Sequence, residues 1–182
     1  MKSERKSFSL VEILAAVAIV GILAAIGFGT YSYAMNSARE SASKALLQRI
    51  AAAFDAAKVK EGYYPTTGGS FVPIAVTIGS DGTVNTISIN GAALSPEFQK
   101  EFVRVVEWDS FAKTVKNGTA EDAWGGTIYY CYPGKINLLG FDLIAPGADG
   151  KFGTAAAATP PDSLSSYRDD DGEPLSDDLA NF

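Results

Sequence analysis

Glu12 is the residue whose chemistry most constrains this chain, because it is a carboxylate inside an apolar segment. From Phe8 the sequence reads FSLVEILAAVAIVGILAAIGF, and no further charge follows Glu12 until Arg39. A carboxylate at the centre of a bilayer costs roughly 2.5–3.5 kcal/mol, and less near the interface. Glu12 is therefore expected to need a partner. An amino group created by cleavage before Phe8 would lie four residues away, on the same helical face.

Other residues with reactive side chains are few. The chain has no histidine, which removes the commonest general base and the commonest transition-metal ligand. Its single cysteine, Cys131, stands in a strand-like run and has no second cysteine to pair with. We expect Cys131 to be a buried small residue, since no histidine exists to activate it. With no nucleophile–base pair or phosphate loop in view, the sequence predicts that the protein is not an enzyme.

A glycine-rich loop at residues 145–153 carries one central carboxylate, Asp149. Calcium takes several oxygen ligands from carboxylates and from the carbonyls of a tightly curved backbone, and glycine permits such curvature. One aspartate does not make a metal site. On chemistry alone, the loop is a solvated turn followed by an acidic tail.

The sequence predicts one long N-terminal helix, and Glu12 lies near its start. About 20 apolar residues suffice to span a bilayer, and the run from Phe8 is that long. In residues 35–60 the apolar positions recur on one helical face. No proline interrupts the segment up to Tyr64, so we predict a single helix from about Phe8 to Lys60, ended by Gly62.

The globular part should combine strands with a second helix. Residues 71–78 and 83–89 predict a β-hairpin, residues 96–108 a helix, and residues 127–132 and 138–144 two further strands. We expect the hairpin to belong to an insertion, residues 69–95, on the subunit surface. The fold class is predicted to be α+β. The predicted divisions are a leader at 1–7, a membrane or filament-core half-helix at 8–34, an amphipathic half-helix at 35–61, a globular domain at 62–159 and an acidic tail at 160–182.

Three interpretations of the N-terminal segment compete. The first is a secretory signal peptide cut after its apolar stretch, for which Ala16-Val17-Ala18 offers a small-residue site. The second is a plain membrane anchor, and the third is a leader cut before the apolar stretch. Glu12 favours the third, because the first two gain nothing from a carboxylate in the apolar run. The basic leader should then stay in the cytoplasm and the remainder face outward.

The octapeptide from Ser7 to Leu14 resembles the start of type IV pilins and pseudopilins. The resemblance implies that a prepilin peptidase cuts between Ser7 and Phe8 and methylates the new amino terminus of Phe8. It also implies that Glu12 neutralises the terminal amine of a neighbouring copy during assembly. Ser7 stands where the family usually has glycine.

Later segments resemble the major pseudopilins of type II secretion systems. These segments are Tyr64-Pro65-Thr66-Thr67, Asp122-x-Trp124-Gly125, Tyr129-Tyr130, Pro133-Gly134, Asp142-Leu143 and Gly147-Ala148-Asp149-Gly150. The resemblance implies a pilin-like fold, in which the long helix packs on a small antiparallel sheet followed by a loop-rich C-terminal region. It also implies a calcium site with Asp149 as first carboxylate. The second, normally a few residues later, is missing here, and Asp162 or one of Asp169, Asp170 and Asp171 is the candidate to replace it.

The implied function is that of a structural subunit which polymerises into a periplasmic pseudopilus for protein export. It would be a single-pass protein of the bacterial inner membrane, with its globular domain in the periplasm. Its expected partners are membrane lipid, further copies in a helical filament, prepilin peptidase, minor pseudopilins, and the inner-membrane assembly platform with its cytoplasmic ATPase. The net charge of -6 disfavours nucleic acid. Two alternatives stay open: a true type IV pilus subunit, and an anchored calcium-dependent binding module that never polymerises.

Overall fold

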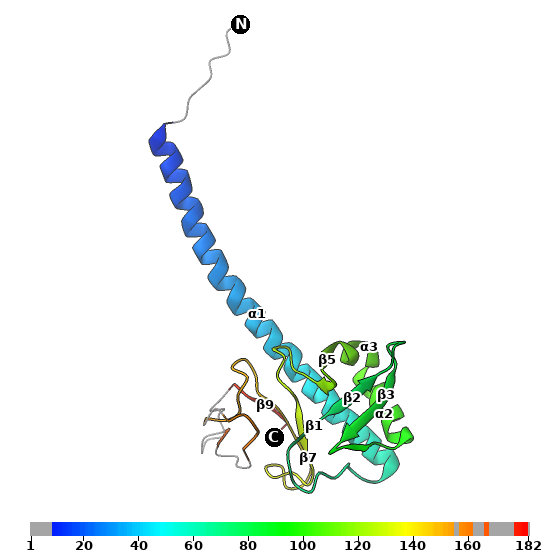
Figure 1. The fold of residues 1–182 in the computed structure, drawn as a ribbon. Coiled ribbons are helices and arrows are strands. Elements are labelled where there is room, and N and C mark those ends of the chain that lie inside the picture. The colour runs from blue at the N-terminus through cyan, green and yellow to red at the C-terminus, as the bar shows by residue number, and fades with distance from the viewer. Residues whose placement is uncertain (1–8, 155–156, 162–165, 168–176, 182) are drawn as a thin grey trace. The chain divides into compact units, whose positions relative to one another are not determined.

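The fold is α+β, as the sequence predicts: a long N-terminal helix is followed by a small antiparallel β-sheet domain. The computed structural model describes residues 9–154, 157–161, 166–167 and 177–181 (Figure 1). The chain forms two compact units, Met1–Ala38 and Arg39–Phe182, which we describe in turn.

Helix α1 spans Leu10–Glu61 and contributes to both units. It ends where the sequence predicts. Gly62 has a φ of 83°, and its N–H bonds to the carbonyl of Lys58 at 2.7 Å. Glycine adopts this left-handed conformation without steric penalty, and so the helix can stop in a hydrogen-bonded turn.

In the first unit, α1 is apolar on every face. Its large apolar side chains between Leu10 and Phe28 are 52–77% exposed. A helix that is hydrophobic all round is normally buried in its working environment, in a membrane or among other helices. By length and composition, α1 is the one described helix able to cross a membrane.

In the second unit, α1 is buried along one face. The buried side chains recur at intervals of three and four residues: Leu47, Ile50, Ala53, Phe54 and Ala57. On the open face, Val59 is 85% exposed. This is the amphipathic half that the sequence predicts, and its apolar stripe packs against the domain.

Two antiparallel sheets form the β part of the second unit. The four-stranded sheet has the order β1 (Val72–Pro73), β7 (Tyr129–Cys131), β8 (Asp142–Ala145) and β9 (Leu179–Ala180). The five-stranded sheet has the order β4 (Ala92–Ala93), β3 (Val84–Ile89), β2 (Ala75–Ile78), β6 (Thr119–Ala120) and β5 (Val115–Lys116). Tyr130 pairs with Leu143 in the first sheet, and Val76 pairs with Ile87 in the second.

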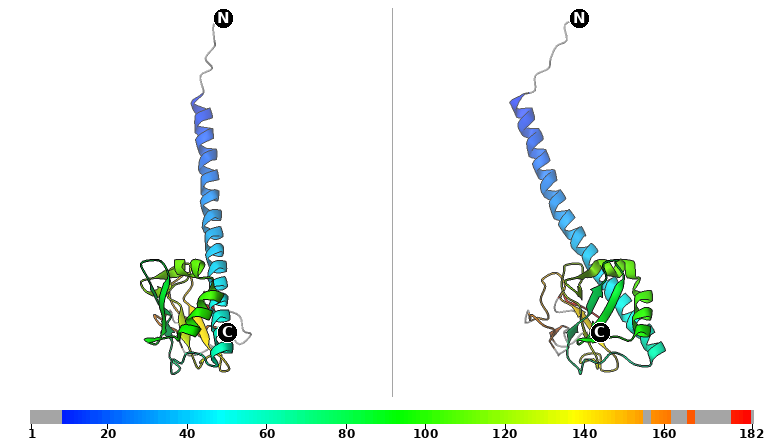
Figure 2. Two further views of the ribbon diagram at one scale, coloured as in Figure 1. Left: turned by 90° about the vertical axis from the view of Figure 1, so that its right-hand side faces the viewer. Right: turned by 45° about the vertical axis from the view of Figure 1, so that its right-hand side comes forward.

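The predicted second helix is confirmed as α2 (Pro96–Val106), with α3 (Trp108–Phe111) and a 3-10 turn, η1 (Ala112–Thr114), behind it. Ser95 caps α2, because its hydroxyl accepts the N–H of Phe98 at 3.1 Å. Glu107, with a φ of 60°, separates α2 from α3. Figure 2 shows these helices and both sheets gathered around the part of α1 that belongs to the second unit.

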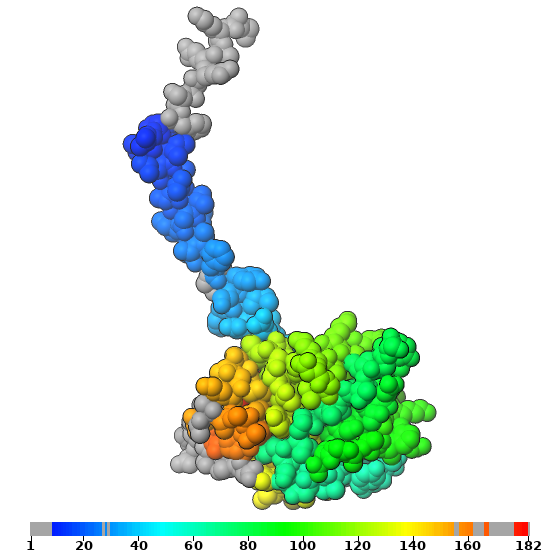
Figure 3. Space-filling model, viewed as in Figure 1, coloured from blue at the N-terminus to red at the C-terminus, as the bar shows by residue number. Residues whose placement is uncertain are grey.

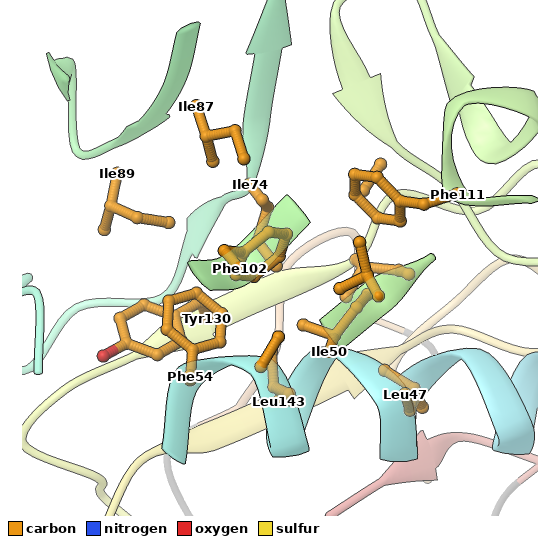
Figure 4. Close-up of a cluster of buried hydrophobic side chains, with 14 of the residues drawn as sticks. Leu47, Ile50, Phe54, Ile74, Ile87, Ile89, Phe102, Phe111, Tyr130 and Leu143 are labelled. Atoms are coloured by element: carbon orange, nitrogen blue, oxygen red, sulfur yellow. The ribbon is translucent and has the colours of Figure 1, made fainter. Parts of the chain in front are cut away.

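Aromatic side chains dominate the core. Phe54 of α1 stacks on Tyr130 of β7 with ring centroids 4.5 Å apart, and meets Phe102 of α2 edge-on at 5.2 Å. Figure 4 shows these three rings lying against one another, with Ile50 and Leu143 nearby. One side chain of α1 therefore joins a sheet strand to the second helix.

The β2–β3 hairpin is confirmed, but the expectation that residues 69–95 form a surface insertion was wrong. Ile74, Val76, Ile87 and Ile89 are at most 2% exposed and belong to the main core. The side chain of Gln99 in α2 fixes the hairpin, accepting the N–H of Ile87 at 3.1 Å and donating to Leu94 at 2.7 Å. The alternating isoleucines and valines face inward because α2 covers them.

The strand predicted at residues 138–144 begins later than expected. Only Asp142 to Ala145 form β8, and the residues before it form a tight loop. The strand predicted at residues 127–132 is confirmed in shorter form as β7. The apolar pair Leu138 and Leu139 reads as strand in the sequence, yet both side chains are exposed in that loop.

Glu101 links α2 to the end of α1. Its side chain is 5% exposed and accepts hydrogen bonds from Arg104 in α2 and from Lys60 in α1. The hydrogen bonds from Arg104 and then Lys60 lower the pKa of Glu101 from 4.5 to about 2. A depressed carboxyl pKa stabilises the folded chain above the unfolded pKa, and this stabilisation is lost as the pH falls toward the folded value.

We predict that Glu101→Gln lowers the melting temperature of the full chain by a few degrees at pH 7. The difference should shrink as the pH falls from 4.5 toward 2, because wild-type Glu101 then takes up its proton. Circular dichroism melts in detergent would measure it. Glu97→Gln, at an exposed position of the same helix, is the matched control. A difference that stayed constant down to pH 2 would contradict this assignment.

Candidate functional site

The start of α1 is a capping box built from Ser9 and Glu12. The carboxylate of Glu12 accepts the backbone N–H of Ser9 at 2.8 Å, and the hydroxyl of Ser9 accepts the N–H of Val11 at 3.3 Å. This reciprocal pattern satisfies two N–H groups that have no partner inside the helix. Glu12 therefore has a partner in its own chain, which the sequence argument did not foresee. Ser7 and Phe8 lie outside the described residues.

The segment that follows the long helix docks on the tyrosine-rich strand. Two hydrogen bonds join Thr67 and Tyr132. The Thr67 N–H donates to the Tyr132 carbonyl at 2.8 Å, and the Tyr132 N–H donates to the side-chain hydroxyl of Thr67 at 3.0 Å. The hydroxyl of Tyr130 donates to the carbonyl of Pro65 at 2.9 Å. The Tyr-Pro-Thr-Thr segment and the tyrosine strand, some 65 residues apart, thus form one interlocked unit.

Tyr64 ties the same segment back to α1. Its hydroxyl donates to Asp55 at 2.5 Å, and the ammonium of Lys58 lies 4.3 Å from its ring centroid. Burial, with the hydrogen bond to Asp55, raises the pKa of Tyr64 to about 12. The phenol therefore stays protonated and keeps donating at any physiological pH.

Asp122 organises the Asp-x-Trp-Gly turn. Its side chain is buried and accepts N–H groups from Trp124 at 2.9 Å, Gly126 at 2.7 Å and Gly147 at 3.2 Å. Burial raises the pKa of Asp122, an effect that these hydrogen bonds only partly offset. The bond to Gly147 attaches this turn to the glycine-rich loop.

Asp142 organises the turn before β8. It is fully buried, and its two oxygens accept the N–H groups of Lys135 at 2.7 Å, Ile136 at 2.9 Å and Asn137 at 2.7 Å. One carboxylate thereby closes a loop that would otherwise leave three backbone donors without a protein partner. The aspartate of the Asp142-Leu143 pair therefore has a structural role, which is to hold this loop.

The glycine-rich loop is closed by the C-terminal strand segment. Asp149 is exposed, and its N–H donates to the carboxylate of Asp177 at 2.9 Å. The N–H of Gly153 donates to Asp178 at 2.6 Å. Gly147, with a φ of 70°, lies so close that a Cβ there would be 2.1 Å from the carbonyl oxygen of Asp177. Only glycine fits this approach.

A hollow of about 370 Å³ opens beside this loop. It is lined by residues 124–127, Tyr129, residues 146–150, Phe152 and Ala158. Asp149 is the only carboxylate among its lining residues in the described part of the chain. Its Oδ1 accepts the N–H of Lys151 at 2.8 Å.

The described residues do not by themselves form a calcium site. Within the described ranges, no three Asp, Glu, His or Cys side chains gather closely enough to hold a metal ion. Asp149, Asp177 and Asp178 reach one loop from two segments, but each is bonded to backbone N–H groups. Asp162 and Asp169, the predicted further ligands, lie outside the described residues. Calcium stays a prediction.

Cys131 is buried, as expected of a packing residue. Its thiol lies 3.3 Å from the carbonyl oxygen of Pro133.

Comparison with known proteins gives a match only in the N-terminal segment. Residues 2–28 match the prokaryotic N-terminal methylation motif. That motif identifies the segment as a type IV pilin-like prepilin leader, and it fits a structural subunit rather than an enzyme. The searches of curated proteins and of solved structures gave no significant match. The motif covers only the leader and the apolar start of α1, so the family and the function of the whole chain are left to be proposed.

Two features of the candidate site were missed by sequence reasoning. The first is the capping box, although Ser9 and Glu12 stand in the spacing typical of one. The second is the approach of Asp177 and Asp178 to the glycine-rich loop. No local pattern signals that approach, because more than 20 residues separate the two segments.

We predict that Asp142→Ala destabilises the folded chain by about 2–4 kcal/mol, because three buried or half-buried N–H groups lose their acceptor. Asp142→Asn should cost less, since one amide oxygen remains to accept. Urea unfolding would measure both. Asp109→Ala removes an exposed carboxylate from α3 and serves as the control. Equal stability of Asp142→Ala and the control would refute the role given to Asp142.

Proposed function

We propose that this chain is a structural subunit that polymerises into the periplasmic pseudopilus of a type II secretion system. The observation that carries the proposal is the N-terminal methylation motif over residues 2–28, with Glu12 at the head of an exposed apolar helix. Such a helix needs lipid or other helices around it, and a polymer of identical stems supplies the second environment.

The proposed sequence of events begins in the inner membrane. Prepilin peptidase cuts between Ser7 and Phe8 on the cytoplasmic side and methylates the amine of Phe8. The subunit waits with its globular domain in the periplasm. The assembly platform and its cytoplasmic ATPase then move subunits out of the lipid. Glu12 exchanges its bond with the N–H of Ser9 for an ion pair with the Phe8 amine of a neighbouring copy.

The interlocked second unit supports a secretion rod over a pilus. The Tyr-Pro-Thr-Thr segment, the tyrosine strand and the buried Asp142 are the features that resemble major pseudopilins. Hydrogen bonds join the segment to the strand, and Cys131 of that strand pairs with Asp142 in the same sheet. Gene neighbours of a secretion system would agree with this. Long surface fibres in unmodified cells would favour a true type IV pilus with minor pilins in place of minor pseudopilins.

A second candidate function is an anchored binding module that never polymerises. The capping box favours it, because Glu12 already has a partner within its own chain. A carboxylate near the membrane interface can then be tolerated without a neighbouring amine. The two functions differ in whether the charge of Glu12 matters.

We predict that Glu12→Ala and Glu12→Gln both abolish polymer formation, while membrane levels of the chain stay unchanged. Gln keeps an oxygen that can accept the N–H of Ser9 but has no charge to pair with an amine. Ladders of cross-linked chains in intact cells would be the readout. Assembly by Glu12→Gln at the wild-type level would show that capping alone matters, and the charge-pairing step would be wrong.

Mass spectrometry of the mature amino terminus tests the processing step. We expect a chain that begins at methylated Phe8. A native polypeptide that still begins at Met1 would remove the proposal as a whole. Ser7→Gly, which restores the residue usual in the family, is the matched variant and should be cut at least as efficiently.

Calcium is proposed as a stabilising ion of the glycine-rich loop. Asp149 would hold it, with Asp177 and Asp178 as the nearest described carboxylates. We predict that millimolar calcium raises the melting temperature of the full chain and that Asp149→Asn removes this rise. Magnesium at equal concentration is the control. A melting temperature that calcium does not change would show that the loop is held by its hydrogen bonds alone.

A further inference from the structure

Two leucines stand exposed at the tip of the loop between β7 and β8. Leu138 is 78% exposed and Leu139 is 99% exposed, the highest value of any large apolar side chain described. In Figure 3 the yellow segment of the chain, which includes this loop, comes to the surface at the lower margin of the packed second unit. The fold itself gains nothing from these side chains.

The tip is held in place by a fixed base. Asp142 accepts three successive N–H groups on one side of the loop. On the other side, Gly134 donates to the carbonyl of Gly140 at 2.9 Å, and Gly140 donates to Asn137 at 3.0 Å. A pre-ordered apolar tip loses little conformational entropy when it binds.

A groove of about 890 Å³ runs beside the tip on the second unit. Its lining is mixed. Small and apolar side chains come from α1, among them Ala52, from β9 and from Phe141 before β8. Polar side chains lie beside them, such as Lys44, Gln48 and Asp55. Leu139 stands at its border and is itself almost fully exposed. The described part of each chain therefore carries both an apolar tip and a groove.

The size of the tip decides what kind of partner it suits. Two leucine side chains offer on the order of 200 Å² of apolar surface, whereas each partner in a stable standard interface buries about 800 Å². The tip cannot hold a free partner by itself. It can add to a contact between molecules that are already held together. Copies joined through their apolar stems meet that condition.

We propose that the tip formed by Leu138 and Leu139 of one copy docks into the groove of a second copy within the polymer. The inference rests on the proposed polymerising function. The tip adjoins the groove of its own copy. The contact is heterologous when each copy gives its tip to one neighbour and receives the tip of another. Repetition of a heterologous contact that does not close produces a helical filament.

Cysteine cross-linking in cells tests the docking. One chain carries Leu139→Cys and a differently tagged chain carries Ala52→Cys, so any hybrid disulfide is intermolecular. Cys131 is buried and present in both. We expect on the order of ten-fold more hybrid product than for Leu139→Cys with Ser80→Cys, because docking raises the effective thiol concentration. Ser80 is exposed at the β2–β3 turn and does not line the groove.

The same cross-link in a Glu12→Ala background separates the two proposals. Loss of the hybrid product there, with its presence in cells where the chain forms cross-linked ladders, supports docking within the polymer. Ladders that form without excess hybrid product overturn the docking contact and leave the polymerising function standing. Absence of ladders from the wild-type chain overturns the proposed function itself. Hybrid product that persists without polymer would show that docking does not depend on assembly, contrary to the inference.

A double variant, Leu138→Ser with Leu139→Ser, gives a second measurement. Both side chains are exposed, so the melting temperature should not change. The yield of cross-linked polymer should fall several-fold. A wild-type yield from this variant would also overturn the inference.

Discussion

The contact between Phe54 of α1 and Tyr130 of β7 is the interaction on which the second unit depends. Phe54 also meets Phe98 and Phe102 of α2, and Phe141 next to β8. Four elements or their flanks therefore share one aromatic cluster, and each aromatic pair adds about 0.5–1.5 kcal/mol beyond simple burial. The helix that serves as the stem in the first unit is, in the second, the centre of the core.

Much of this fold was open to prediction from patterns in the sequence. The unbroken helix, its stop at Gly62, the capped second helix and the hairpin all follow from local rules of spacing, capping and turn chemistry. The failures share a cause. Residues 69–95 were expected at the surface, while the inward side chains of their hairpin are buried in the main core. Residues 138–141 were judged by apolarity, while Asp142 draws that backbone into a loop.

The residues of the candidate site also fall into those that local sequence patterns indicate and those that they do not. Glu12 was recognisable because a charge in an apolar run is costly, but its bond to the N–H of Ser9 requires a defined helix start. Asp149 was recognisable from its glycines. Its neighbours Asp177 and Asp178 were not, because only the pairing of β9 with β8 brings them to the loop. Tertiary pairing of distant segments carries information that no single segment contains.

Strand β9 has a consequence for how this chain must be handled. All four residues of β8 are buried, and β9 covers one of its edges. If the last residues were trimmed by a protease, or displaced by a bulky tag, β8 would present an open row of backbone donors and acceptors beside an apolar surface. Such an edge recruits strands from other molecules and leads to aggregation. Purified material that clumps should first be checked for an intact C-terminal end.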